Sequence, residues 1–140
     1  MSETSSDRRV TSWAANYLHL RSDDNFLRVF LVLMHLWNID PRSAEQLLAA
    51  PSGTYGTWVA GPAHLRAEQR ERISHLAAIY FDVERIFGGE VTARRPITYD
   101  WIKLPNKAFD NKSALAVLCN GTLEDFVRVR DHLEEGIGWV

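Results

Sequence analysis

The chain lacks the features that mark disulfide-bonded, membrane-spanning and secreted proteins. Its 140 residues include one cysteine, Cys119, which alone cannot form an internal disulfide or a cysteine-based metal site. No stretch reaches the roughly 18 apolar residues that indicate a membrane-spanning helix. The polar start MSETSSDRRV lacks the apolar centre of a signal peptide. These absences predict a cytoplasmic protein with no membrane partner.

An excess of positive charge is also missing. Sixteen Lys and Arg residues stand against 18 Asp and Glu residues, which gives a net charge of −2. This balance does not indicate a general nucleic-acid binder, although it leaves room for a local DNA-binding surface. The contents of 46% hydrophobic and 24% charged residues are ordinary for a globular protein. The length suits one domain, or two small ones that share a core.

No catalytic or metal-binding pattern is recognisable in the sequence. None of the pairs among its five histidines has metal-ligand spacing with a third ligand nearby. No Ser, Cys or Lys stands in a known nucleophile motif, and there is no glycine-rich phosphate loop. We therefore expect a protein that is not an enzyme and that holds neither a metal nor a cofactor.

Apolar residues recur at helical spacing and never alternate as in a strand, which predicts an all-α fold. Ser22 and Asp40 stand where helices begin, and Gly88 ends the longest one. Helices are expected over about 22–37, 42–50, 52–60, 68–87, 98–104 and 113–119, with a last one beginning at Thr122. The predicted apolar stripe of this last helix is Leu123, Phe126, Val127, Leu133 and Ile137. The predicted organisation is a partly disordered N-terminal arm (1–25), a helix-turn-helix domain (26–88), a linker (89–97) and a second small helical domain (98–140).

Two short helices with a tight turn at Ala50-Pro51-Ser52, flanked by longer helices, are typical of an Xre-like helix-turn-helix bundle. The candidate DNA-binding residues are Arg42, Ser52, Thr54 and Thr57. The exposed face of the second short helix would carry no cation. Because phosphate contacts supply much of the affinity for DNA, we expect weak DNA binding by the isolated protein.

The end of the chain is both apolar and anionic. Glu134 and Glu135 lie at the C-terminal end of the last predicted helix, where negative charge opposes the helix dipole by about 0.3–1 kcal/mol. A local rule that is broken without compensation suggests function; two solvated glutamates without a role are the alternative. Together with Trp139 and Val140, these residues suit a pocket built for an aromatic, phosphate-bearing ligand.

An ordered set of segments carries a family resemblance over about residues 26–140. The first half contributes LWNID, SGTYGTW and EQRERISHLAAIY, and the second half contributes WIKLPN, FDNKSAL and VRVRDHLEEGIGW. The chain resembles the Xre/MbcA/ParS-type antitoxins of bacterial RES–Xre toxin–antitoxin modules. Two positions depart from the family pattern: Thr57 stands where a basic residue is frequent, and Asp110-Asn111 stand where many members have glycines.

The resemblance implies a protein partner, a RES-domain toxin similar to ADP-ribosyltransferases. It implies that the antitoxin occludes the NAD site of the toxin and represses its own operon, with operator DNA bound by the toxin complex. A homodimer within a heterotetramer or larger complex is the implied assembly. A stand-alone helix-turn-helix repressor is the alternative. The implied toxin-binding residues are Trp101, Asn106, Phe109, Arg130, Glu134, Glu135, Gly136, Trp139 and Val140.

Overall fold

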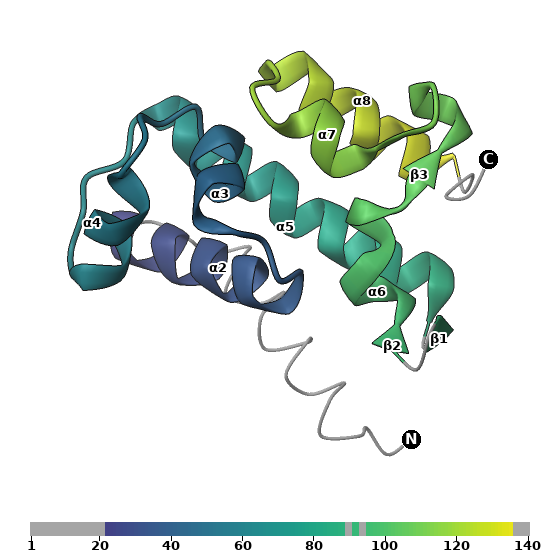
Figure 1. Cartoon of the computed structure of the whole chain (residues 1–140), viewed down its shortest axis with the longest axis horizontal. Coiled ribbons are helices and arrows are strands. Elements are labelled where there is room, and N and C mark those ends of the chain that lie inside the picture. Colours follow the sequence, from purple (N-terminus) through teal and green to yellow (C-terminus); the bar gives the residue numbers. More distant parts are fainter. Residues whose placement is uncertain (1–21, 89–90, 93–94, 136–140) are drawn as a thin grey trace.

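The computed structural model describes residues 22–88, 91–92 and 95–135, and within them the chain is mostly helical (Figure 1). The prediction of an all-α chain is therefore confirmed at the level of fold class. The helices are α2 (Asp23–Leu36), α3 (Pro41–Leu47), α4 (Thr54–Ala60), α5 (Ala67–Phe87), α6 (Ile97–Asp100), α7 (Ala114–Leu118) and α8 (Leu123–Glu134), with 3-10 turns η1 (Trp101–Lys103) and η2 (Lys107–Phe109). Most of the predicted arm and the last five residues lie outside the described residues.

Side-chain caps fix several helix starts, as the sequence indicated. Ser22 accepts a hydrogen bond from the backbone N–H of Asn25 at 3.3 Å. Asp40 accepts one from the N–H of Ser43 at 3.1 Å, and Pro41 occupies the first helical position. Thr122 begins α8 with a capping box, because its own N–H donates to the Asp125 carboxylate at 2.9 Å.

Two short antiparallel strand pairs were not predicted. β1 (Val91–Thr92) pairs with β2 (Arg95–Pro96) inside the expected linker, and β3 (Pro105–Asn106) pairs with β4 (Lys112–Ser113). Each strand has two residues, which is too short to produce an alternating pattern. The β3–β4 turn includes Asp110 and Asn111 at φ 57° and 65°. Asn and Asp are the non-glycine residues that tolerate this left-handed conformation best.

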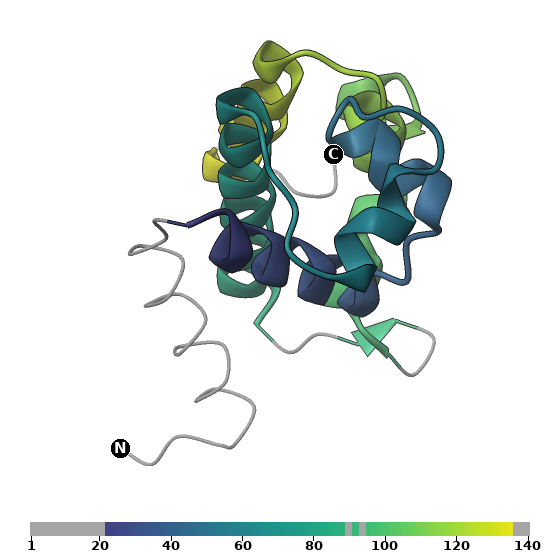
Figure 2. The ribbon, with the colours of Figure 1, turned by 90° about the vertical axis from the view of Figure 1, so that its left-hand side faces the viewer.

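α5 is the central helix, and it packs against α2 on one side and α8 on the other (Figures 1 and 2). Phe126, Val129 and Leu133 of α8 are fully buried. They follow the helical spacing i, i+3, i+7, which directs them to one face. The prediction that Val127 belongs to this stripe is wrong: its side chain is 43% exposed, because it is turned about 100° from Phe126 along the helix.

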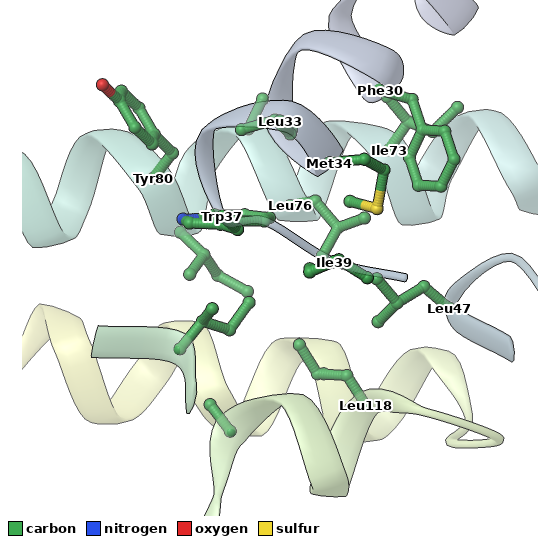
Figure 3. Packing of buried hydrophobic residues seen from close by; sticks show 14 of the residues in the cluster. Phe30, Leu33, Met34, Trp37, Ile39, Leu47, Ile73, Leu76, Tyr80 and Leu118 are labelled. Atoms are coloured by element: carbon green, nitrogen blue, oxygen red, sulfur yellow. The ribbon is translucent and has the colours of Figure 1, made fainter. Parts of the chain in front are cut away.

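A single apolar cluster includes residues from both sides of the 89–97 segment. Figure 3 shows Phe30 and Leu33 of α2 beside α5, and Trp37, the C-cap residue of α2, in the same core as Leu47 of α3 and Leu118 of α7. Lys103 adds a polar contact between the two halves by donating to the carbonyl of Asn38 at 2.6 Å. α5 carries a broad apolar surface because two of its faces are buried.

Candidate functional site

The first candidate surface is formed by α3, α4 and the turn between them. Trp58 holds α4 on the core, with its ring against Phe30 edge-on at 5.5 Å. The remaining outer face of α4 is exposed and uncharged, and Val59 is 61% exposed. This face consists of Gly53, Gly56, Thr57, Val59 and Ala60.

The four predicted DNA-binding residues lie around this turn, but they differ in exposure and in their contacts. Ser52 and Thr57 are exposed. Thr54 is half-buried, and its hydroxyl donates to the carbonyl of Pro51 at 2.7 Å, so it serves the local turn. Arg42 is half-exposed and lies 3.4 Å from the carboxylate of Glu45. The side chains thus offer hydroxyls to a ligand, with the single guanidinium already paired.

A buried carboxylate on α3 fixes the start of α4. Glu45 is 3% exposed, and its Oε2 accepts a hydrogen bond from the backbone N–H of Tyr55 at 2.9 Å. Gly53, at the N-cap of α4 with φ 94°, has no side chain to cap the helix. Hydrogen bonds from the N–H groups of Tyr55 and Gly53, and the neighbouring Arg42, hold the pKa of Glu45 below its usual range. This role was not predicted, because the capping residue lies on the preceding helix.

α5 and its N-cap residue supply three donors to the carbonyls at the end of α3. Arg72 donates to Leu47, Gln69 to Leu48 and Arg66 to Ala49, each at 3.2 Å. The donors are three residues apart, so they lie along one side of α5. The last carbonyls of a helix have no intrahelical partner, and here three successive ones are satisfied from another helix. Two of these donors, Gln69 and Arg72, belong to the run EQRERI, which therefore helps to hold the end of α3 on α5.

Three of the predicted toxin-binding residues are buried in the second half. Trp101, Asn106 and Phe109 are 2%, 4% and 4% exposed. Asn106 caps η2 by accepting from the N–H of Ala108 at 2.9 Å. Their side chains therefore shape the surface above them, and offer a partner almost no contact area of their own in this conformation.

The other predicted residues lie within α8 or follow its end in the sequence. Arg130 is half-buried, with Nη1 3.0 Å from His75 Nδ1 and Nη2 3.9 Å from Glu134, so it joins α8 to α5. Burial, followed by the charge of Arg130, lowers the pKa of His75. Glu134 and Glu135 are exposed. Gly136, Trp139 and Val140 lie outside the described residues.

A hollow of about 340 Å³ lies between η2 and the outer face of α8. Phe109 lies beneath it, with the guanidinium of Arg128 5.7 Å above its ring and His132 edge-on at 5.3 Å. Burial lowers the pKa of His132, which favours the neutral imidazole. The lining residues are Ala108, Phe109, Glu124, Val127, Arg128, Asp131, His132 and Glu135. The implied toxin-binding residues include Phe109 and Glu135 of this lining, but the hollow itself was not predicted, because Val127 was assigned to the core.

Among residues 22–88, 91–92 and 95–135, no three His, Cys, Asp or Glu side chains come close enough to hold a metal ion. In the same part of the chain, the helices are all too short or too polar to cross a membrane. The one cysteine, Cys119, is half-buried, and burial raises its thiol pKa to about 11. At neutral pH it is therefore a protonated thiol with little nucleophilic character.

These features define a mostly helical protein with two candidate binding surfaces. No family model matches the chain, and no solved structure matches it. The chain is 31% identical over 109 residues to the uncharacterized protein y4oB of Sinorhizobium fredii (strain NBRC 101917 / NGR234). The match covers 77% of this chain and 81% of that protein. The chain belongs to the same family as y4oB.

Proposed function

We propose that this protein is an antitoxin that binds a RES-domain toxin and occludes its NAD site. The observation that carries the proposal is the outer face of α8. There, exposed Val127 and Glu135 line the same hollow, and Glu134, beside Glu135 at the end of the helix, is also exposed. Exposed apolar side chains rimmed by polar ones mark partner surfaces. The family resemblance of segments 101–106, 109–115 and 127–139 supports the same assignment.

The two glutamates have a specific role in this proposal. A site that binds NAD must hold a diphosphate, so it presents cationic donors, most often arginine. A protein that covers such a site leaves those cations unpaired unless it supplies anions. Glu134 and Glu135, with the segment that follows them, provide that charge. We expect the complex to contain two copies of the chain, within a heterotetramer or a larger assembly.

Co-expression with a RES-domain toxin, sought first in the reading frames next to the gene, tests this proposal. The protein should co-purify with the toxin, restore growth and abolish NAD consumption in vitro. The variant Glu134→Gln/Glu135→Gln should weaken the complex by about 2–5 kcal/mol if buried charge pairs are broken. The variant Glu71→Gln/Asp24→Asn, which removes the same charge from exposed positions elsewhere, is the matched control. Equal affinities of the two variants, measured by calorimetry, would remove Glu134 and Glu135 from the interface.

Deletion of Ile137 to Val140 tests the rest of the tail. Because these residues follow the end of α8, the shortened chain should unfold at the same denaturant concentration as the full one. It should neutralise the toxin much less well. Full protection of cells by the shortened chain would show that the tail does not occlude the site.

DNA binding is the second candidate function, and the arrangement of α3, turn and α4 favours it. We propose that the protein acts as an operator-binding subunit chiefly within the toxin complex. The exposed face of α4 carries no cation, and most DNA affinity comes from phosphate contacts. Paired half-sites would add contacts when a complex joins two copies. Nanomolar operator binding by the toxin-free protein at physiological salt would instead identify a stand-alone repressor.

A further inference from the structure

The turn between α7 and α8, here called the 119–121 turn, makes two direct contacts and one indirect contact with α3. The thiol of Cys119 donates to the carbonyl of Ser43 at 3.7 Å, and the N–H of Asn120 donates to the carbonyl of Gln46 at 3.2 Å. The third contact runs through Arg72 of α5. Helix α3, from the first half of the chain, is thus held by a turn from the second half.

Arg72 joins these two parts by donating to both. Its Nη1 reaches the carbonyl of Leu47 at 3.2 Å, and its Nη2 reaches the carbonyl of Gly121 at 2.8 Å. The guanidinium lies 5.2 Å from the centre of the Phe126 ring, and the side chain is 4% exposed. A planar group with several donors in a fixed geometry holds two acceptors in one relative position. If either carbonyl moves and Arg72 follows it, the hydrogen bond from Arg72 to the other carbonyl is strained.

A hydrogen bond from Tyr55 to Glu45 joins α3 to the start of α4. Glu45, two residues before Leu47, holds the N–H of Tyr55 at the start of α4. Gly53, the N-cap residue, offers no side chain that could replace it. The position of the start of α4 consequently depends on the position of α3.

We propose that the 119–121 turn, Arg72, α3 and Glu45 form a mechanical link that couples the second half of the chain to the orientation of α4. Displacing the turn releases the start of α4, and releasing α4 loosens the turn. Energetic coupling between two sites is reciprocal, so both directions must show it. This link does not depend on the proposed function. If α4 meets an operator and α8 meets a toxin, it is the route by which one partner alters binding of the other.

The first test perturbs the turn and observes α4. A Cβ at position 121 would lie 2.7 Å from the carbonyl of Val117 and 3.1 Å from that of Leu118, so Gly121→Ala must shift the turn. Hydrogen exchange at the Tyr55 amide should accelerate by about tenfold, the effect of losing one hydrogen bond on a local opening equilibrium. Val127→Ala, on the outer face of α8, should leave that rate unchanged.

The second test perturbs α4 and observes the turn. Cys119 is the single thiol of the chain, so its alkylation rate reports opening of the 119–121 turn without ambiguity. Glu45→Gln should accelerate alkylation severalfold. Gly56→Ala is the control, because a Cβ there meets open space and α4 keeps its start. Unchanged alkylation in Glu45→Gln would overturn the link.

Hydrogen exchange must also distinguish local release of α4 from a loss of global stability. The amide of fully buried Leu76 in α5 serves as the reference for global opening. Equal acceleration at Tyr55 and Leu76 in Gly121→Ala would mean general destabilisation and would refute the proposal. In the double variant Gly121→Ala/Arg72→Lys, the acceleration at Tyr55 should be smaller than the product of the single effects, because both act through one link. Multiplicative effects would equally refute it.

Discussion

Replacing Arg72 should destabilise this protein more than any other arginine substitution on α5. Its guanidinium donates to the carbonyls of Leu47 and Gly121 and contacts Glu68 at 2.8 Å. Hydrogen bonds that involve a charged donor contribute about 1.5–3 kcal/mol each. The ion pair contributes less than about 1 kcal/mol, because Glu68 is 44% exposed and its carboxylate is hydrated by solvent when Arg72 is replaced.

For Arg72→Met we expect a loss of about 3–4 kcal/mol in the free energy of unfolding. Methionine replaces much of the aliphatic stem but leaves two carbonyls without their donor. Arg72→Lys keeps the charge and can reach one carbonyl at a time, so a loss of about 1.5–3 kcal/mol is expected. Either loss is large beside the roughly 5–15 kcal/mol that stabilises an ordinary domain.

Urea unfolding followed by circular dichroism would measure these losses. Arg66→Met is the control: it removes the same kind of side chain from the N-cap position of the same helix, where the side chain makes an exposed hydrogen bond to Ala49 at 3.2 Å. The expected loss there is within about 0.5 kcal/mol. If Arg72→Met unfolds within about 1 kcal/mol of the wild type, or if Arg66→Met costs as much, the two hydrogen bonds of Arg72 to Leu47 and Gly121 do not stabilise the fold as argued.

Two further predictions follow from the same region. The pKa of Glu45 is lower in the folded than in the unfolded chain, so its ionised carboxylate stabilises the fold above the ordinary value of 4.5, and this stabilisation is lost as the pH falls through the folded pKa. Glu45→Gln should therefore flatten the acid limb of a urea-midpoint profile; an unchanged limb would contradict the cap. Gly56→Ala should raise stability by about 0.5–1 kcal/mol, because the position is helical and open, whereas crowded Gly121→Ala should lower it. Thermal melts that show the opposite order would contradict this reading of the two glycines.

The helices were predictable because their signals are local. Capping residues such as Asp40 and Thr122 act within three residues, and apolar spacing identifies a buried face. The assignment of Val127 shows the limit of a count of apolar residues. The spacing from Phe126 to Val129 and Leu133 defines the buried face, and Val127 departs from it.

The hydrogen bonds of Arg72 and Glu45 to other elements were not predictable, because they join residues far apart in the sequence. Arg72 and Gly121 are 49 residues apart, and Glu45 caps a helix that begins after it. Single-sequence patterns do not record such pairs. The run 68–73 was therefore predicted as part of a helix, but the hydrogen bonds that its Gln69 and Arg72 side chains make to the end of α3 were not predicted.

The burial of Trp101, Asn106 and Phe109 changes what a test of partner binding must do. Substituting any of these residues disturbs the core or the η2 cap, so lost binding would not distinguish contact from misfolding. Val127, Glu134 and Glu135 are exposed, and substitutions at such positions usually leave stability within about 0.5 kcal/mol. A loss of affinity at these exposed positions with an unchanged unfolding midpoint therefore locates the interface on α8. The same loss at a buried position locates nothing.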